Sequence, residues 1–104
     1  MQRHLDDELK KLNTNLLKMA GLTEEAIHKA VLALRNLDAK LAEELVQNDR
    51  VIDEMENEIE ELAIELSALF QPMANDLRFI TTAMRITTEL ERIADLTVNI
   101  CQRT

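Results

Sequence analysis

The fold is decided by residues 87–100, TTELERIADLTVNI, which are strongly helical and yet place carboxylates among apolar positions. Glu91 falls on an apolar face, where a core residue is expected, and Asp95 lies four residues further along the same side of the helix. Two like charges at this spacing repel each other, so we expect something positive to compensate them. The face continues in both directions at alternating steps of four and three, through Met73, Leu77, Ile80, Met84, Thr87, Glu91, Ala94, Val98 and Cys101.

Composition excludes several classes of protein. The 104 residues carry a formal net charge of −8 and include one Gly, one Pro and neither Trp nor Tyr, which predicts a single all-α domain of long helices. The acidic balance argues against nucleic acid as a partner, because phosphates are held by clusters of Lys and Arg. No apolar run is long enough to insert directly into a membrane. With a single cysteine, Cys101, and no secretory signal, we expect a cytoplasmic protein.

Three apolar patterns separated by two breaks predict three helices. We expect them at about residues 3–36, 38–69 and 73–104 of one domain that covers 1–104. Asp38 suits an N-cap, and Gln71-Pro72 ends the second helix because proline cannot continue it. Gly21 lies inside the first pattern, either as a close-packing point or at a slight bend. Short connections make such helices run up, down and up, in an antiparallel three-helix bundle.

The third helix carries a second apolar stripe, about 100° round from the first. Two such stripes give it a wider apolar surface than the other helices have, and contact with two neighbours accounts for only part of this width. We therefore expect the second stripe to be partly uncovered and to serve self-association or docking of another domain. Its residues are Phe79, Ala83, Ile86, Leu90, Ile93, Thr97 and Ile100.

The antiparallel register brings two acidic pairs to one height. Residues at equal distance from Pro72 lie side by side on the second and third helices, so Asp53 faces Glu91 and Asp49 faces Asp95. Both helices thus present an acid-x-x-x-acid pair at this level. Carboxylate clusters without thiolates suit Mg, Mn or Fe(II). The prediction is a divalent metal site formed by Asp49, Asp53, Glu91 and Asp95, with no catalytic residue and no organic cofactor.

Two other interpretations stay open at this point. Acidic pairs are common in a chain with 20 Asp and Glu residues, so the four carboxylates can be a solvated face of a purely structural bundle, neutralised by Arg50 and Arg92. Glu25 and His28 have the Glu-x-x-His spacing of ferritin-like di-iron proteins, which suggests a metal-dependent enzyme. That chemistry needs a second copy of the motif and a fourth helix. No nucleophile with a neighbouring base and no nucleotide-binding loop is present, so we expect no catalysis.

Three segments of the chain carry a resemblance to a known family. RHLDDEL at residues 3–9, QPMANDLRFI at 71–80 and ELERIADLTVNI at 89–100 resemble the phosphate-uptake regulator family, PhoU. The likeness covers the whole chain. Members of the family consist of two three-helix halves in tandem, and this sequence is similar to one of them, the N-terminal half, with the second half absent.

The resemblance implies a regulator without catalytic activity. Members of the family carry E(D)xxxD motifs that bind metal ions. By the resemblance, these motifs correspond in this sequence to Asp49 with Asp53 and to Glu91 with Asp95. The implied role is that of an adaptor between a phosphate ABC transporter and a sensor histidine kinase, which represses the phosphate-starvation response when phosphate is plentiful.

Overall fold

Three helices account for the part of the chain that this computed structural model describes, residues 2–69 and 74–102. They are α1 (Gln2–Asn36), α2 (Ala39–Leu69) and α3 (Ala74–Gln102). The end of α1 at Asn36 and the start of α2 at Ala39 lie within one residue of the predicted positions, and the other four limits adjoin residues outside the described part of the chain. The Gln71-Pro72 break and Met73 lie outside the described residues. Within the described residues, no helix combines the length and the apolar character needed to cross a bilayer.

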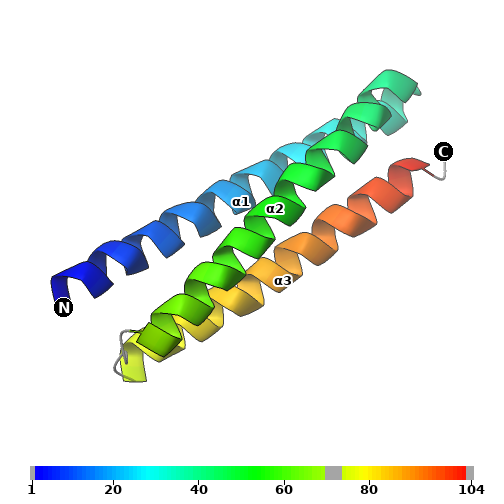
Figure 1. Cartoon of the computed structure of the whole chain (residues 1–104). Coiled ribbons are helices and arrows are strands. Elements are labelled where there is room, and N and C mark those ends of the chain that lie inside the picture. The colour runs from blue at the N-terminus through cyan, green and yellow to red at the C-terminus, as the bar shows by residue number, and fades with distance from the viewer. Residues whose placement is uncertain (1, 70–73, 103–104) are drawn as a thin grey trace.

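The helices form the predicted all-α antiparallel bundle. α1 and α3 run in the same direction and α2 runs against both, so the two chain ends lie at opposite ends of the rod (Figure 1). Each helix packs along the other two. The bundle measures 53 × 17 × 16 Å, about as wide as three packed helices. Its buried core consists of two clusters, a larger one that includes Leu12, Ile59 and Ile80 and a smaller one that includes Ala30, Leu45 and Cys101.

The turn between α1 and α2 combines two helix-ending devices. Leu37 has a positive φ of 52°, and the Asp38 amide donates to the Ala33 carbonyl at 3.0 Å, which closes the C-terminus of α1. The Asp38 carboxylate then accepts hydrogen bonds from the amides of Lys40 and Leu41, both at 3.1 Å. Asp38 is thus the N-cap of α2, as its sequence position predicts.

The buried row of α3 differs from either stripe expected from the sequence. Of the first stripe, Ile80, Thr87, Ala94 and Cys101 are buried. Of the second stripe, only Ala83 and Thr97 are buried. Glu91 is only half-buried, so the expectation that it occupies a core position is wrong. The reason is that α3 contacts α1 and α2 at once, so the line pointing to the bundle axis falls between the two stripes. The inward row is Ile80, Ala83, Thr87, Leu90, Ala94, Thr97 and Cys101.

Gly21 is a weak point of α1 and has no packing role. It lies on the exposed side of the helix, and a Cβ atom added to it meets no atom within 4 Å. The close-packing alternative is therefore wrong. The helix continues through Gly21 without interruption, and Met19 and Thr23 on either side of it are fully buried. The Thr23 hydroxyl donates to the Met19 carbonyl at 2.9 Å, which satisfies this polar group inside the core.

Candidate metal centre

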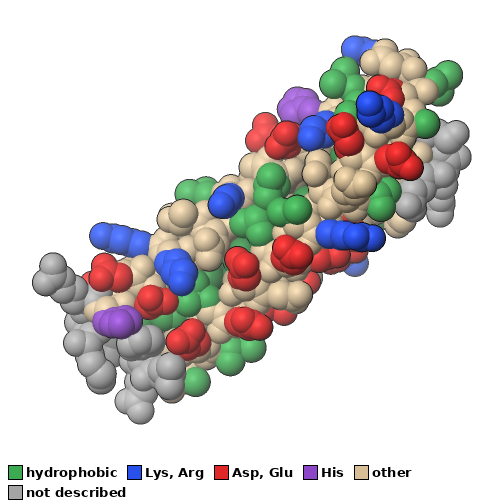
Figure 2. Space-filling view, turned by 45° about the horizontal axis from the view of Figure 1, so that its top comes forward, with side chains coloured by type: hydrophobic (Ala, Val, Ile, Leu, Met, Phe, Trp, Pro, Cys, Tyr) green, Lys and Arg blue, Asp and Glu red, His purple; other side chains and the backbone are tan. Residues whose placement is uncertain are grey.

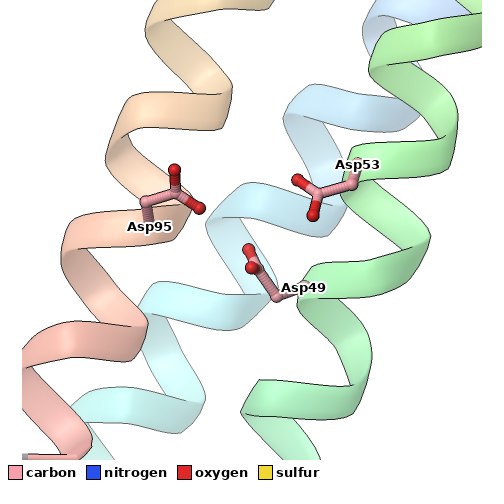
Figure 3. Close-up of side chains that lie close together, drawn as sticks. All are labelled: Asp49, Asp53 and Asp95. Carbon is pink, nitrogen blue, oxygen red and sulfur yellow. The ribbon is translucent and has the colours of Figure 1, made fainter.

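Three carboxylates meet between α2 and α3. Asp49 and Asp53 project from α2 and Asp95 projects from α3, and one oxygen of each lies within 4.8 Å of one oxygen of the other two. Figure 3 shows the three side chains pointing toward the space between the two helices. A single cation placed there would lie within reach of oxygens from both helices.

The antiparallel register explains this meeting. Asp49 and Asp53 lie four residues apart, so they project from the same side of α2, one turn above the other. α2 ends and α3 begins on either side of residues 70–73, and positions equally far from that connection lie at one level. Asp49 and Asp95 satisfy this relation, as the sequence predicts. The sequence thus contained the information that brings acids from two helices together.

Glu91, the fourth predicted ligand, lies beside the three aspartates. A side-chain hydrogen bond with Asp95, then burial, then the charges of Asp95, Glu56 and Asp53, raise the pKa of Glu91 to about 7. Glu91 is not part of the group whose oxygens lie within 4.8 Å of one another. It is therefore placed to complete the site only through a change of side-chain rotamer, which a half-buried glutamate on a helix surface permits.

Asp49 is the most strongly perturbed aspartate of the cluster. Burial, followed by the charges of Asp53 and Asp95 and a hydrogen bond to Asp95, raises the pKa of Asp49 to about 6. The pKa of Asp53 is also raised, by burial and by the charge of Asp95. One oxygen of Asp49, Oδ1, is buried and has no hydrogen-bond partner among the described residues. A buried carboxylate oxygen without a donor is costly unless a proton or a cation satisfies it.

Among the described residues, no cation pairs with a carboxylate of the cluster. Arg92 contacts Glu89 at 3.9 Å, and both side chains are largely exposed to solvent. Arg50 is exposed, and none of the ion pairs found in residues 2–69 and 74–102 includes a member of the cluster. The arginines therefore do not play the neutralising role expected from the solvated-face interpretation. The donor set consists of carboxylate oxygens alone, which fits a hard divalent cation, and the unpartnered oxygen of Asp49 offers it a position.

Two glutamates extend the acidic cluster along α2, and sequence reasoning missed them. Burial, followed by the charges of Glu60, Asp53 and Asp95, raises the pKa of Glu56. Glu56 also contributes to the raised pKa of Glu91. The signal was available, because Glu56 and Glu60 again lie four residues apart and follow Asp53 on the same side of α2. It was hidden by the many other acids of this helix.

The Glu-x-x-His motif on α1 does not form a comparable cluster. Glu25 pairs with Lys29 at 3.4 Å, while His28 lies 4.0 Å from Glu24 and has 77% of its side chain exposed. These are surface pairs along a single helix, so the structure gives the di-iron interpretation no supporting geometry. Cys101 is buried in the core, with its Sγ 3.9 Å from the Ala30 carbonyl oxygen, in the packing role that its spacing predicts.

Comparison with known proteins places the chain in a family. The PhoU domain matches residues 16–104. The phosphate-specific transport system accessory protein PhoU homolog of Rhizobium meliloti is 42% identical over 94% of this chain and 41% of its own length. The homolog of Aquifex aeolicus is 43% identical over 92% of this chain and 43% of its own, and PhoU of Escherichia coli K12 is 34% identical over 91% and 39%. The chain thus spans less than half the length of these relatives, and it belongs to the PhoU family.

Proposed function

We propose that this chain is a metal-binding accessory protein of a phosphate transport system and acts in the cytoplasm without catalysing a reaction. Its relatives are named as accessory proteins of the phosphate-specific transport system, and this similarity carries the proposal. In this role it couples a phosphate ABC transporter to a sensor histidine kinase and represses the phosphate-starvation response. A rigid rod of three helices suits an adaptor, because it presents long fixed surfaces to other proteins.

The metal is proposed to act as a clamp between α2 and α3. Asp49 and Asp53 would hold it from one helix and Asp95 from the other, with Glu91 available beside them. A divalent cation offsets the repulsion among these carboxylates and replaces the missing donor at Asp49. Mn, Fe(II) and Mg all accept oxygen ligands of this kind.

Complementation tests the regulatory role. The chain would be produced in an Escherichia coli K12 strain that lacks its own PhoU protein and carries a reporter of phosphate starvation. In phosphate-rich medium we expect the parent chain to lower the reporter signal. Capture of the phosphate transporter from solubilised membranes by the immobilised chain provides a second measurement, independent of whether a half-length relative restores full repression.

Matched variants connect this role to the carboxylates. Asp49→Asn with Asp95→Asn should weaken repression, whereas Glu58→Gln with Glu61→Gln, which removes the same charge from another face of α2, should leave it intact. An unchanged reporter together with no captured transporter would contradict the accessory role. If both double variants repressed the reporter equally strongly, the accessory role would not depend on the metal-binding carboxylates.

A further inference from the structure

One row of apolar side chains on α3 remains exposed along the length of the bundle. Phe79, Ile86, Ile93 and Ile100 recur every seven residues, and 38%, 42%, 40% and 54% of their surfaces are accessible. Their inward neighbours on the helix, such as Ala83 and Thr97, are buried. The row is therefore a regular feature of the helix surface and not a set of scattered apolar residues.

A second exposed row completes a coiled-coil pattern with the first. Thr82, Glu89 and Leu96 each lie three residues after a member of the first row, and all three are exposed. Alternating steps of three and four define the seam along which a further helix packs. We name this set the outer seam of α3; it consists of Phe79, Thr82, Ile86, Glu89, Ile93, Leu96 and Ile100.

Arginines flank the outer seam at the same period. Arg78, Arg85 and Arg92 each precede a member of the first apolar row, in the position from which coiled-coil helices form ion pairs with a partner. All three are exposed. This basic edge contrasts with α2, which alone carries ten acidic and two basic residues. Figure 2 shows carboxylates spread along much of one face of the rod, with Lys and Arg side chains between them.

Charge complementarity distinguishes among the possible occupants of the outer seam. In a second copy packed antiparallel, the arginine edges of the two α3 helices would face each other and repel. In a parallel copy they would lie level with positions 83 and 90 of that copy, where Ala83 is buried in its own bundle and Leu90 is apolar, so no acid is there to compensate them. An anionic lipid surface would have to take Glu89, whose ion-pair contact is Arg92 at 3.9 Å, out of water in the middle of the buried strip. A helix with acids along its edge satisfies the arginines, and a basic residue on it can reach Glu89.

We propose that the outer seam of α3 docks an amphipathic helix of another protein segment, one whose apolar seam is flanked by acidic side chains. The apolar residues of that helix cover Phe79, Ile86 and Ile93, and its acids pair with Arg78, Arg85 and Arg92. This surface is separate from the carboxylates that α3 shares with α2, since Asp95 projects toward α2 (Figure 3). The proposal thus stands or fails independently of metal binding.

Two designed peptides test this specificity directly. Both form a helix of four heptads with the same Leu and Ile seam, but one carries Glu beside the seam and the other carries Lys. Binding to the purified chain is followed by fluorescence anisotropy of the labelled peptide. We expect the Glu-flanked peptide to bind roughly tenfold more tightly, because three exposed ion pairs each contribute a small factor. Added salt should reduce this preference.

Charge reversal supplies the decisive control. Arg78→Glu with Arg85→Glu and Arg92→Glu should invert the preference, so that the Lys-flanked peptide binds more tightly. Lys11→Glu with Lys18→Glu and Arg35→Glu makes the same charge change at exposed positions of α1 and should leave the preference as in the parent. Ile86→Ser with Ile93→Ser should abolish binding of both peptides. Circular dichroism verifies that each variant keeps its helices.

Four results would overturn the proposal. They are equal affinity for the two peptides, no binding of either, tighter binding of phosphatidylglycerol vesicles than of the Glu-flanked peptide, and a dimer in sedimentation that Ile86→Ser dissociates. The third result would assign the outer seam to a membrane surface. The fourth would assign it to self-association of this chain, the occupant that the sequence alone leaves equally open.

Discussion

The raised pKa values of single carboxyl groups make the stability of the metal-free protein depend on pH. The pKa values of about 6 for Asp49 and about 7 for Glu91 lie above the ordinary values of 3.8 and 4.5. The folded protein therefore binds these protons more tightly than the unfolded chain does. Their contribution to stability is complete below about pH 4 and is lost as the pH rises through about 6 to 7.

We accordingly expect the free energy of unfolding in chelator-treated buffer to fall between about pH 4 and pH 7. Urea unfolding at constant ionic strength measures this profile. Asp49→Asn with Glu91→Gln should flatten it, because neither replacement titrates. A profile that rises over the same range in the parent would show that these carboxyl groups are not under mutual repulsion in solution.

Gly21 offers a prediction about a single backbone position. Gly21→Ala should raise the free energy of unfolding by about 1 kcal/mol, because the added methyl group meets no atom while the helix loses a flexible residue. Thermal unfolding followed by circular dichroism would detect the higher midpoint. A lower midpoint would mean that α1 needs the flexibility of glycine at this point.

At the residue scale, the sequence predicted that acids of two helices lie close together. It did not predict how deeply each acid is buried or which further acids belong to the cluster. Spacing and register were sufficient to bring Asp49, Asp53 and Asp95 together, because helix geometry is regular over this length. The half-buried position of Glu91 was not predicted, since spacing alone does not show how a helix is rotated about its axis. Glu56 was missed because the sequence does not show which of the many acids on α2 lie near α3.

Among the structural elements, the turn between α1 and α2 carries avoidable strain. Leu37 adopts a left-handed conformation that side chains with a Cβ atom disfavour, and 82% of its surface is exposed. Leu37→Gly should therefore stabilise the protein by about 0.5 to 1 kcal/mol, the relief of strain being partly offset by the greater freedom of glycine in the unfolded chain. Urea unfolding measures the difference.

The N-cap of α2, Asp38, stabilises the protein, so its removal should lower the free energy of unfolding. Asp38→Ala removes the acceptor for the amides of Lys40 and Leu41 and should cost about 1 kcal/mol. If Leu37→Gly destabilised the protein and Asp38→Ala had no effect, the turn in solution would differ from the one described here.

Helices were more predictable than the faces they bury. The three helices follow from apolar periodicity, and the limit between α1 and α2 follows from the capping residue Asp38. The inward row of α3 did not follow, because two overlapping stripes fit the same periodicity and only packing against two neighbours selects the row between them. Periodicity defines a helix and its approximate apolar side, and tertiary contacts define its rotation.

For the molecule as a whole, the proposed metal acts as a tie between two antiparallel helices. The cluster lies between α2 and α3, far along both helices from their shared connection. A cation there couples segments that are distant in sequence and counteracts repulsion within a molecule of net charge −8. If the ion binds only the folded bundle, its binding free energy adds to the stability of the fold.

Thermal unfolding with and without Mn²⁺ is the most direct test of this central claim. The parent is compared with Asp53→Asn plus Glu91→Gln, and with Glu58→Gln plus Glu61→Gln as a control of equal charge on another face of α2. At about 100 times the dissociation constant, Mn²⁺ should stabilise the parent and the control by about 2.7 kcal/mol. The Asp53 and Glu91 variant should lose this rise and melt higher than the parent in chelator. An equal response of all three proteins to Mn²⁺, or none in the parent, would contradict the metal clamp.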